Sequence, residues 1–357
     1  MKSYLIVSAA LLGGLAHASD PCDCFPVCGC GHDGPSTAPI SVMGDHLHVK
    51  GEWMFSLRHM YMDMDGMYAG SNSVSPASVH AAGYLVSPTR MTMEMSMLGA
   101  MYAPSDDLTL MAMISYIQSD MDHVIDPGAG MLIAANAGNN TFSTRSVGVG
   151  DLKLTALLRL KDEGRHQLHG GFGISLPTGS ISNSDILPGP GGRLSRQLPA
   201  AMQPGSGTFD LLPSLTYLYE GDGWTGGLQA RGVFRTHENH HDYRLGHRGE
   251  IDAWAGCQPL SWLSVTSGLG FSWDGELEGT QADVAQVLPM PPGRITVPTA
   301  FGENHGGMRL DAILGFNLQI VEAQRIGVDL RLPLWQDLNG HRLGQDLTAT
   351  LGWTLAF

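Results

Sequence analysis

Apolar and polar residues alternate with a period of two along most of this chain. In Met308–Ile320 every even position is apolar, whereas the odd positions include Arg309 and Asp311. Such alternation places the two kinds of side chain on opposite faces of a β-strand. The pattern predicts about twelve strands, each near the length that a tilted membrane strand needs. They are His48–Tyr61, Thr89–Ala103, Asp107–Met121, Gly150–Lys161, His166–Leu176, Thr208–Glu220, Trp224–Thr236, Arg248–Gln258, Trp262–Trp273, Met308–Ile320, Arg325–Gln336 and Gln345–Phe357.

The segments between these strands alternate in length. Short turns, such as Pro104–Asp106 and Gly221–Gly223, alternate with long irregular segments, such as Pro177–Gly207. Short turns at one end and long loops at the other are typical of an outer-membrane barrel with both termini in the periplasm. A soluble β-sandwich is the alternative, but it rarely keeps this asymmetry throughout. The fold class expected is therefore all-β: a single antiparallel, up-and-down transmembrane β-barrel of about twelve strands.

The two ends of the chain carry export features. Residues 1–18 combine Lys2, a short apolar run and a small-x-small site at Ala16–Ala18, which predicts a cleaved signal peptide. At the other end, the last strand stops on the aromatic Phe357. We therefore divide the chain into a signal peptide (1–18), a cysteine-rich periplasmic segment that could act as a plug (19–46) and an outer-membrane barrel (47–357). The expected location is the outer membrane of a Gram-negative bacterium.

The polar row of each strand predicts which residues line the lumen. A charge on the lipid face costs a few kcal/mol at mid-depth, so charged side chains on barrel strands should point inward. Their mixed signs favour ion pairs along the wall over a strongly charged pore. The lumen-lining residues predicted in this way are Glu52, Arg58, Lys153, Arg159, His169, Arg231, Arg235, Glu250, Asp252, Arg309, Asp311, Asp329 and Arg331.

Several stretches resemble the outer-membrane barrels grouped as meta-pathway phenol-degradation transporters. They are Gly148–Leu154 at the start of a strand, Leu176–Gly179 at the end of one, Gly205–Asp210, and the terminal Phe357. The resemblance covers mainly residues 148–357. It implies a barrel that acts as a channel for small hydrophobic or aromatic compounds.

Methionine is concentrated near the N-terminal end of the barrel: 13 of the 19 methionines lie between Met54 and Met121. In Arg90–Met97 the methionine row opposes Thr92, Glu94 and Ser96, so we expect that row to face lipid as hydrophobic filler. In two other strands the methionines share the polar row and should face the lumen, where thioethers suit Cu(I). With a nearby histidine, these candidate metal ligands are Met54, Met60, Met62, Met64, Met111, Met113, Met121 and His123.

Four cysteines lie within nine residues of the mature N-terminus and form a second group of candidate ligands. In an oxidising periplasm they predict two disulfides. The Cys-x-Cys spacing with a nearby histidine equally suits a thiolate site for Cu(I) or Zn(II). Both interpretations stay open for Cys22, Cys24, Cys28, Cys30 and His32. Cys257 stands alone and is expected to be a small apolar filler.

Composition and motifs narrow the function. The net charge of −14 argues against nucleic acid as a partner. No Gly-rich phosphate loop, HExxH run or Gly-x-Ser-x-Gly motif occurs, so an enzyme is not expected and no catalytic residue is assigned. We expect a channel for a small solute with a methionine-lined lumen that handles copper, and Cu(I) is the one possible cofactor or cargo.

Two alternatives remain: a conduit for small aromatic or hydrophobic compounds, and a surface protein anchored by its barrel. The expected partners are outer-membrane lipid and lipopolysaccharide. The barrel-assembly machinery is a further expected partner, through the terminal strand that ends at Phe357.

Overall fold

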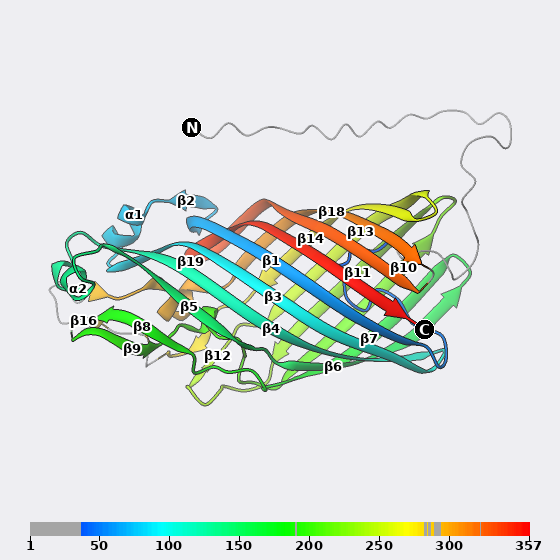
Figure 1. The fold of residues 1–357 in the computed structure, drawn as a ribbon, viewed down its shortest axis with the longest axis horizontal. Helices are drawn as coiled ribbons and strands as arrows, with labels where there is room; N and C mark the ends of the chain where they lie inside the picture. The colour runs from blue at the N-terminus through cyan, green and yellow to red at the C-terminus, as the bar shows by residue number, and fades with distance from the viewer. Residues whose placement is uncertain (1–36, 190, 282–283, 285–286, 289–293, 322) are drawn as a thin grey trace.

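The computed structural model describes residues 37–189, 191–281, 284, 287–288, 294–321 and 323–357. Its main feature is one antiparallel sheet that curves until its first and last strands pair (Figure 1). Along the wall the order is β19-β18-β14-β13-β11-β10-β7-β6-β4-β3-β1, and β1 pairs with β19 to close the ring. The prediction of a single up-and-down antiparallel barrel is confirmed.

The closed path contains eleven named strands, but β19 crosses the wall twice. Its first part, up to Leu338, pairs with β18, and its second part pairs with β1. Eleven strands with one counted twice give twelve crossings among the described residues. The wall strands are β1 (Trp53–Gly70), β3 (Val86–Ser105), β4 (Leu108–Ile125), β6 (Leu152–Glu163), β7 (His166–Leu176), β10 (Asp210–Glu220), β11 (Trp224–Arg235), β13 (Arg248–Leu260), β14 (Leu263–Asp274), β18 (Gly307–Val321) and β19 (Gln324–Ala356).

The exposure of side chains follows the period-two pattern. In β18, Leu314 and Phe316 are exposed, whereas Asp311 and Asn317 are fully buried. The same inversion, with apolar residues outside and polar residues inside, recurs around the wall. Only a barrel whose outer face meets hydrocarbon gains stability from this arrangement. In the part of the chain that the structure describes, no helix is long and apolar enough to cross a membrane.

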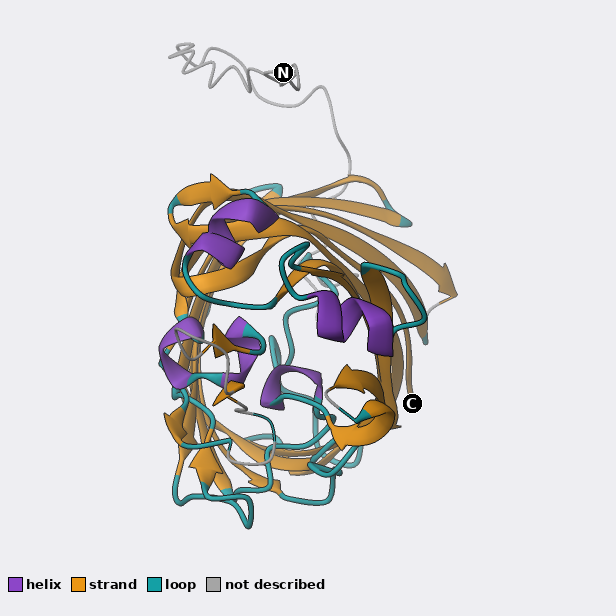
Figure 2. Cartoon of the chain, turned by 90° about the vertical axis from the view of Figure 1, so that its left-hand side faces the viewer, coloured by secondary structure: helices purple, strands orange, loops and turns teal. Residues whose placement is uncertain are grey.

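The two ends of the barrel differ. Tight turns and the C-terminus lie at one end, the short-turn end, on the right in Figure 1. At the other end, the long-loop end, helices and small hairpins fold over the opening, as the axial view in Figure 2 shows. The elements outside the continuous wall path are β2 (Asn72–Val74), α1 (Pro76–Ala81), α2 (Gly130–Ala135), β5 (Thr141–Val149), β8 (Ser184–Gly189), β9 (Gly192–Gln197), η1 (Ala200–Met202), β12 (Tyr243–Arg244), β15 (Glu278–Gly279), β16 (Val287–Leu288), β17 (Arg294–Ile295), η2 (Pro298–Ala300) and η3 (Gly302–Asn304).

The wall extends into three segments that were predicted to be loops. β1 continues to Gly70, and β5 pairs with β4 up to Val149. Residues 337–344 belong to β19, where the chain turns tightly between its two crossings. The neighbouring wall strands β1, β3 and β4 have 18 to 20 residues, more than the 9–11 needed to cross a bilayer. Where a strand projects past the hydrocarbon, its outer row no longer has to be apolar, so the alternation used for prediction fades.

Candidate functional site: the lumen and its mouth

One side of the lumen wall is lined with methionine. The register pairs Met60 with Met95 and Met62 with Met93 across β1 and β3, and directly paired residues share one face of a sheet. The same parity holds along β4, where Thr109 is fully buried and its neighbour Leu110 is exposed. We call this inner face of β1, β3 and β4 the methionine wall. It consists of Met54, Met60, Met62, Met64, Met91, Met93, Met95, Met97, Met101, Met111, Met113 and Met121.

The structure corrects one prediction about these residues. The row Met91, Met93, Met95 and Met97 was expected to face lipid, but it faces the lumen. Met97 is 7% exposed, whereas the adjacent Leu98 is 59% exposed. The prediction was wrong because it assigned the more apolar row to the outside. This part of β3 lies toward the long-loop end, where Thr, Glu and Ser on the outer row carry little penalty.

The opposite side of the lumen is lined with ion pairs. Arg331 of β19 bonds to both carboxylate oxygens of Asp252 on β13, at 2.8 and 3.1 Å. Arg231 of β11 contacts Asp252 at 3.1 Å and Glu250 at 3.0 Å. Asp252 is fully buried. Isolated buried charges are costly, and here Asp252 pairs with two arginines and Glu250 with three. We call these residues, with Arg309 and Asp311 of β18, the ionic wall.

A stretch of chain crosses the lumen between the two walls. Residues 37–49 precede β1 and form hydrogen bonds with inward-facing side chains of strands around the ring. The Ser41 amide donates to Asp329 at 2.6 Å, and Arg331 donates to the Ser41 hydroxyl at 3.1 Å. On the other side, the His48 amide donates to Thr109 of β4 at 3.1 Å. We call residues 37–49 the lumen segment; it lies in the short-turn half of the barrel.

The strands leave room for this segment at glycines. Ile40 is 1% exposed and packs against β19 at Gly327 and Gly352. A Cβ atom at either glycine would lie 2.7 or 2.4 Å from an Ile40 carbon, closer than atoms can approach. Wall side chains also bind the backbone carbonyls of the lumen segment. The Gln229 side-chain amide donates to the Met43 carbonyl, and the His169 ring bonds to the Gly44 carbonyl at 2.8 Å. The wall is therefore shaped for the segment.

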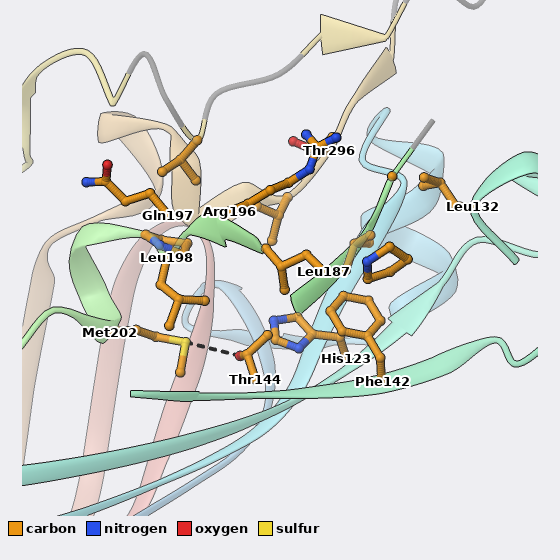
Figure 3. Close-up of a pocket in the computed structure, with 16 residues that line it drawn as sticks. His123, Leu132, Phe142, Thr144, Leu187, Arg196, Gln197, Leu198, Met202 and Thr296 are labelled. Atoms are coloured by element: carbon orange, nitrogen blue, oxygen red, sulfur yellow. Dashed lines mark hydrogen bonds between the residues drawn. The ribbon is translucent and has the colours of Figure 1, made fainter. Parts of the chain in front are cut away.

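A pocket opens at the long-loop end. Its cavity volume is about 80 Å³, and most of its lining is apolar. Figure 3 shows the His123 ring stacked on Phe142, with centroids 4.6 Å apart, and the Thr144 hydroxyl bonded to the Met202 sulfur at 3.2 Å. His123 Nδ1 is buried without a hydrogen-bond partner among the described residues. We call this the mouth pocket.

The mouth pocket and the methionine wall are continuous. Met202 lines the pocket and also belongs to the buried apolar cluster that contains Met91 and Met121. At the short-turn end, Met54 and Met101 pack in a second cluster with Leu47 of the lumen segment against it. Thioether side chains therefore run from the pocket to the lumen segment.

The three motifs that carried the family resemblance meet at one point of the wall. The Asp151 carboxylate accepts hydrogen bonds from the amides of Gly179 and Ser206, at 2.9 and 2.8 Å. The segments that contain Gly179 and Gly205 cross so closely that a Cβ atom on Gly179 would lie 2.7 Å from the Cα of Gly205. Glycine is therefore required here by backbone packing.

The other residues predicted for the site are placed as follows. Arg58, Lys153, His169, Arg235 and Asp329 lie on inward-facing rows. Arg159 bonds to the backbone of Asp106 in a short turn, and Glu52 bonds to the amide of Val49 just before β1. Cys257 is exposed on β13. Cys22, Cys24, Cys28, Cys30 and His32 lie outside the described residues, as does the predicted signal peptide.

The sequence did not predict the residues that line the mouth pocket or the contacts of the lumen segment. The mouth pocket combines side chains from β3, β4, β5, β9 and η1, which only the tertiary fold brings together. The contacts of the lumen segment are equally non-local; apolar Ile40 and Val42 gave the single hint. Among the residues described, no group of three or more His, Cys, Asp or Glu side chains is arranged to hold a metal ion.

The chain resembles known proteins in its fold and not in its sequence. No family model and no curated protein matches the chain in sequence. Among solved structures, the COG4313 outer membrane channel from Pseudomonas putida F1 is similar over 88% of this chain and 98% of its own, with a TM-score of 0.58 and 17% identity. This likeness shows that the two chains share the fold of a closed antiparallel β-barrel.

Two further solved structures match with lower scores. The β domain of the Bordetella autotransporter BrkA has a TM-score of 0.44 and 10% identity, over 87% of this chain and all of its own. The P. putida toluene transporter TodX has a TM-score of 0.40 and 9% identity, over 87% and 91%.

Proposed function

We propose that the protein is an outer-membrane channel for a small solute, with its long loops outside the cell and its short turns in the periplasm. The observation that carries the proposal is the continuous line formed by the mouth pocket, the methionine wall and the lumen segment. A structural barrel needs no such line, because its lumen could be filled by side chains from all strands alike. Here the path is apolar at the mouth and stays thioether-lined until the lumen segment blocks it.

The cargo that the wall favours is a soft metal ion, copper as Cu(I). Thioethers are soft ligands, and the register brings methionines of three strands onto one inward face. The cysteine-rich residues 22–30 would lie on the periplasmic side of the barrel, where they could receive or deliver such an ion. Under this proposal the lumen segment closes the path at rest.

A second cargo is a small aromatic or hydrophobic compound. The apolar lining of the mouth pocket and the stacked His123–Phe142 pair favour it, because flexible methionines would then serve as an adaptable greasy lining. Kinship with the meta-pathway phenol-degradation transporters would agree with this cargo. Lipopolysaccharide and the barrel-assembly machinery belong to the proposal as partners of any such barrel, whereas a purely anchoring barrel gives the lumen path no role.

Removing the lumen segment tests the channel proposal. We expect planar-bilayer conductance to rise several-fold when residues 19–49 are deleted from the mature chain, because the segment contacts strands on both sides of the lumen. Ser41→Ala keeps the whole chain and removes one attachment, so it should raise the frequency of opening by less. An unchanged conductance in both proteins would contradict the proposal.

The opened barrel in liposomes also separates the two cargoes. Met60, Met62 and Met64 changed together to leucine keep the apolar volume and remove sulfur. If the pore carries a soft ion, Ag(I) entry should fall in this variant while toluene entry persists; if it carries aromatic compounds alone, Ag(I) entry should be negligible in both proteins.

A further inference from the structure

Two levels of the methionine wall differ from the rest because three neighbouring strands each contribute a methionine. At the long-loop end, Met64 pairs with Met91, which pairs with Met121. At the short-turn end the same strands place Met54, Met101 and Met111 in register. We call these sets the upper row and the lower row. The levels between them carry two methionines or one.

The geometry of a sheet allows each row to converge on one ion. Adjacent strands lie about 4.8 Å apart, so the outer two methionines of a row flank the central one at nearly equal distances. The unbranched side chain has three rotatable bonds, which lets its sulfur swing toward a neighbour. Met91 and Met101 occupy the centre of the two rows. Three sulfurs can therefore approach one point from three strands.

The surroundings select the kind of ion. Met91 and Met121 are 4% and 2% exposed, and Met54 and Met101 are each 5% exposed. The rows offer neutral sulfur atoms, and among the described residues no group of three or more His, Cys, Asp or Glu side chains is arranged to compete for a metal ion. Hard divalent ions require oxygen ligands, whereas a soft monovalent ion is held by thioether.

Hydrophobic filling alone does not account for the placement of methionine. If methionine served only as an apolar side chain, it should occur on both faces of these strands. The outward positions of β1, β3 and β4 instead carry exposed residues such as Leu57, Leu98 and Leu110. Buried methionine also loses more rotamer freedom than leucine. Placing methionine inside and leucine outside therefore costs stability, and a role for the sulfur would account for this cost.

We infer that the upper and lower rows are two binding sites for a soft monovalent cation, Cu(I) or Ag(I), placed at the entry and exit of the methionine wall. This inference rests on the proposed channel function, because the two sites would bracket its path. Between them, the pairs Met62–Met93 and Met60–Met95 provide steps about 6.6–6.8 Å apart along the strands. An ion could then pass from thioether to thioether without entering the ionic wall.

The test is a titration with Ag(I), a redox-stable probe, of the refolded full-length chain with ¹³C-methyl-labelled methionine. N-ethylmaleimide blocks free cysteines, and excess imidazole competes for histidine sites. We expect two equivalents to bind, with methyl shifts confined to the six methionines of the two rows. Met91→Leu should abolish one equivalent, Met101→Leu the other, and the double variant both.

Met113→Leu is the matched control. Met113 lies on the same inner face but pairs with Gly99, outside either row, so this variant should still bind two equivalents. The inference is overturned if the wild-type chain binds no Ag(I), if both row variants retain two equivalents, or if the shifted methyls lie outside the rows. Bilayer conductance of the same preparations is measured separately, so the channel proposal can stand when the two sites fail.

Discussion

The two walls of this lumen solve the same packing problem with opposite chemistry. The ionic wall on β11, β13, β18 and β19 holds each charge through fixed partners, such as Asp252 between Arg331 and Arg231. The methionine wall on β1, β3 and β4 consists mainly of thioethers, which need no hydrogen-bond partner and adapt by rotation about their side chains. The lumen segment is attached to both, through Ser41 on one side and His48 on the other.

The ionic wall is therefore rigid, whereas the methionine wall is adaptable. A buried charge that loses its partner is heavily destabilising, so the ionic wall must keep one geometry. Thioethers have no obligatory partner, so the methionine wall can yield to a passing solute at little cost. Under the proposed channel function, the ionic wall keeps a fixed geometry and the methionine wall yields to the solute.

The largest effect is expected from breaking the ionic wall. Asp252→Ala leaves Arg331 and Arg231 facing each other with Glu250 as their remaining anion. Because removing one partner from a buried pair strands a charge, the free energy of unfolding should fall by about 3 kcal/mol. Urea unfolding in detergent, followed by tryptophan fluorescence, measures it.

Asp222→Ala is the control for that change. Asp222 forms an ion pair with Arg165 in a short turn and is 84% exposed. Water screens such a pair, so its loss should change stability by less than about 1 kcal/mol. Equal effects of the two variants would show that the ionic wall is solvated and would remove one side of the comparison.

A smaller effect is expected on the methionine wall. Met93 and Met95 changed together to leucine conserve volume and apolar character, so each should cost less than about 1.5 kcal/mol in the same unfolding assay. An adaptable lining tolerates the change. A loss as large as that of Asp252→Ala would mean that this wall is a tightly fitted core, which could not yield to a solute.

Sequence alone predicted the barrel because lipid imposes a rule on every membrane-facing residue. Charged inward rows, such as Arg309 and Asp311, followed from the same rule. It failed for Met91–Met97, where the strand nears the end of the hydrocarbon and both rows are chemically permissible. The mouth pocket could not be predicted, since Phe142 and Met202 meet only through the folded loops. Likewise, no local pattern links Ile40 to Gly327 and Gly352; their contact spans nearly the whole chain.

The smallest effect concerns pH and the methionine-wall side of the lumen segment. Burial, and secondarily the neighbouring His46, lowers the pKa of His48 below its usual 6.5, although Glu52 at 3.1 Å and Asp45 oppose the shift. The packed segment therefore disfavours a proton that the released segment accepts, so packing weakens as pH falls through about 6.5. Channel opening in bilayers should rise a few-fold between pH 7.5 and 5.5. His48→Gln should remove this dependence while leaving the Ser41 attachment intact. If the dependence persists unchanged, His48 is not the titrating group, and His169 of β7, which bonds to Gly44 of the segment at 2.8 Å, is the next group to replace.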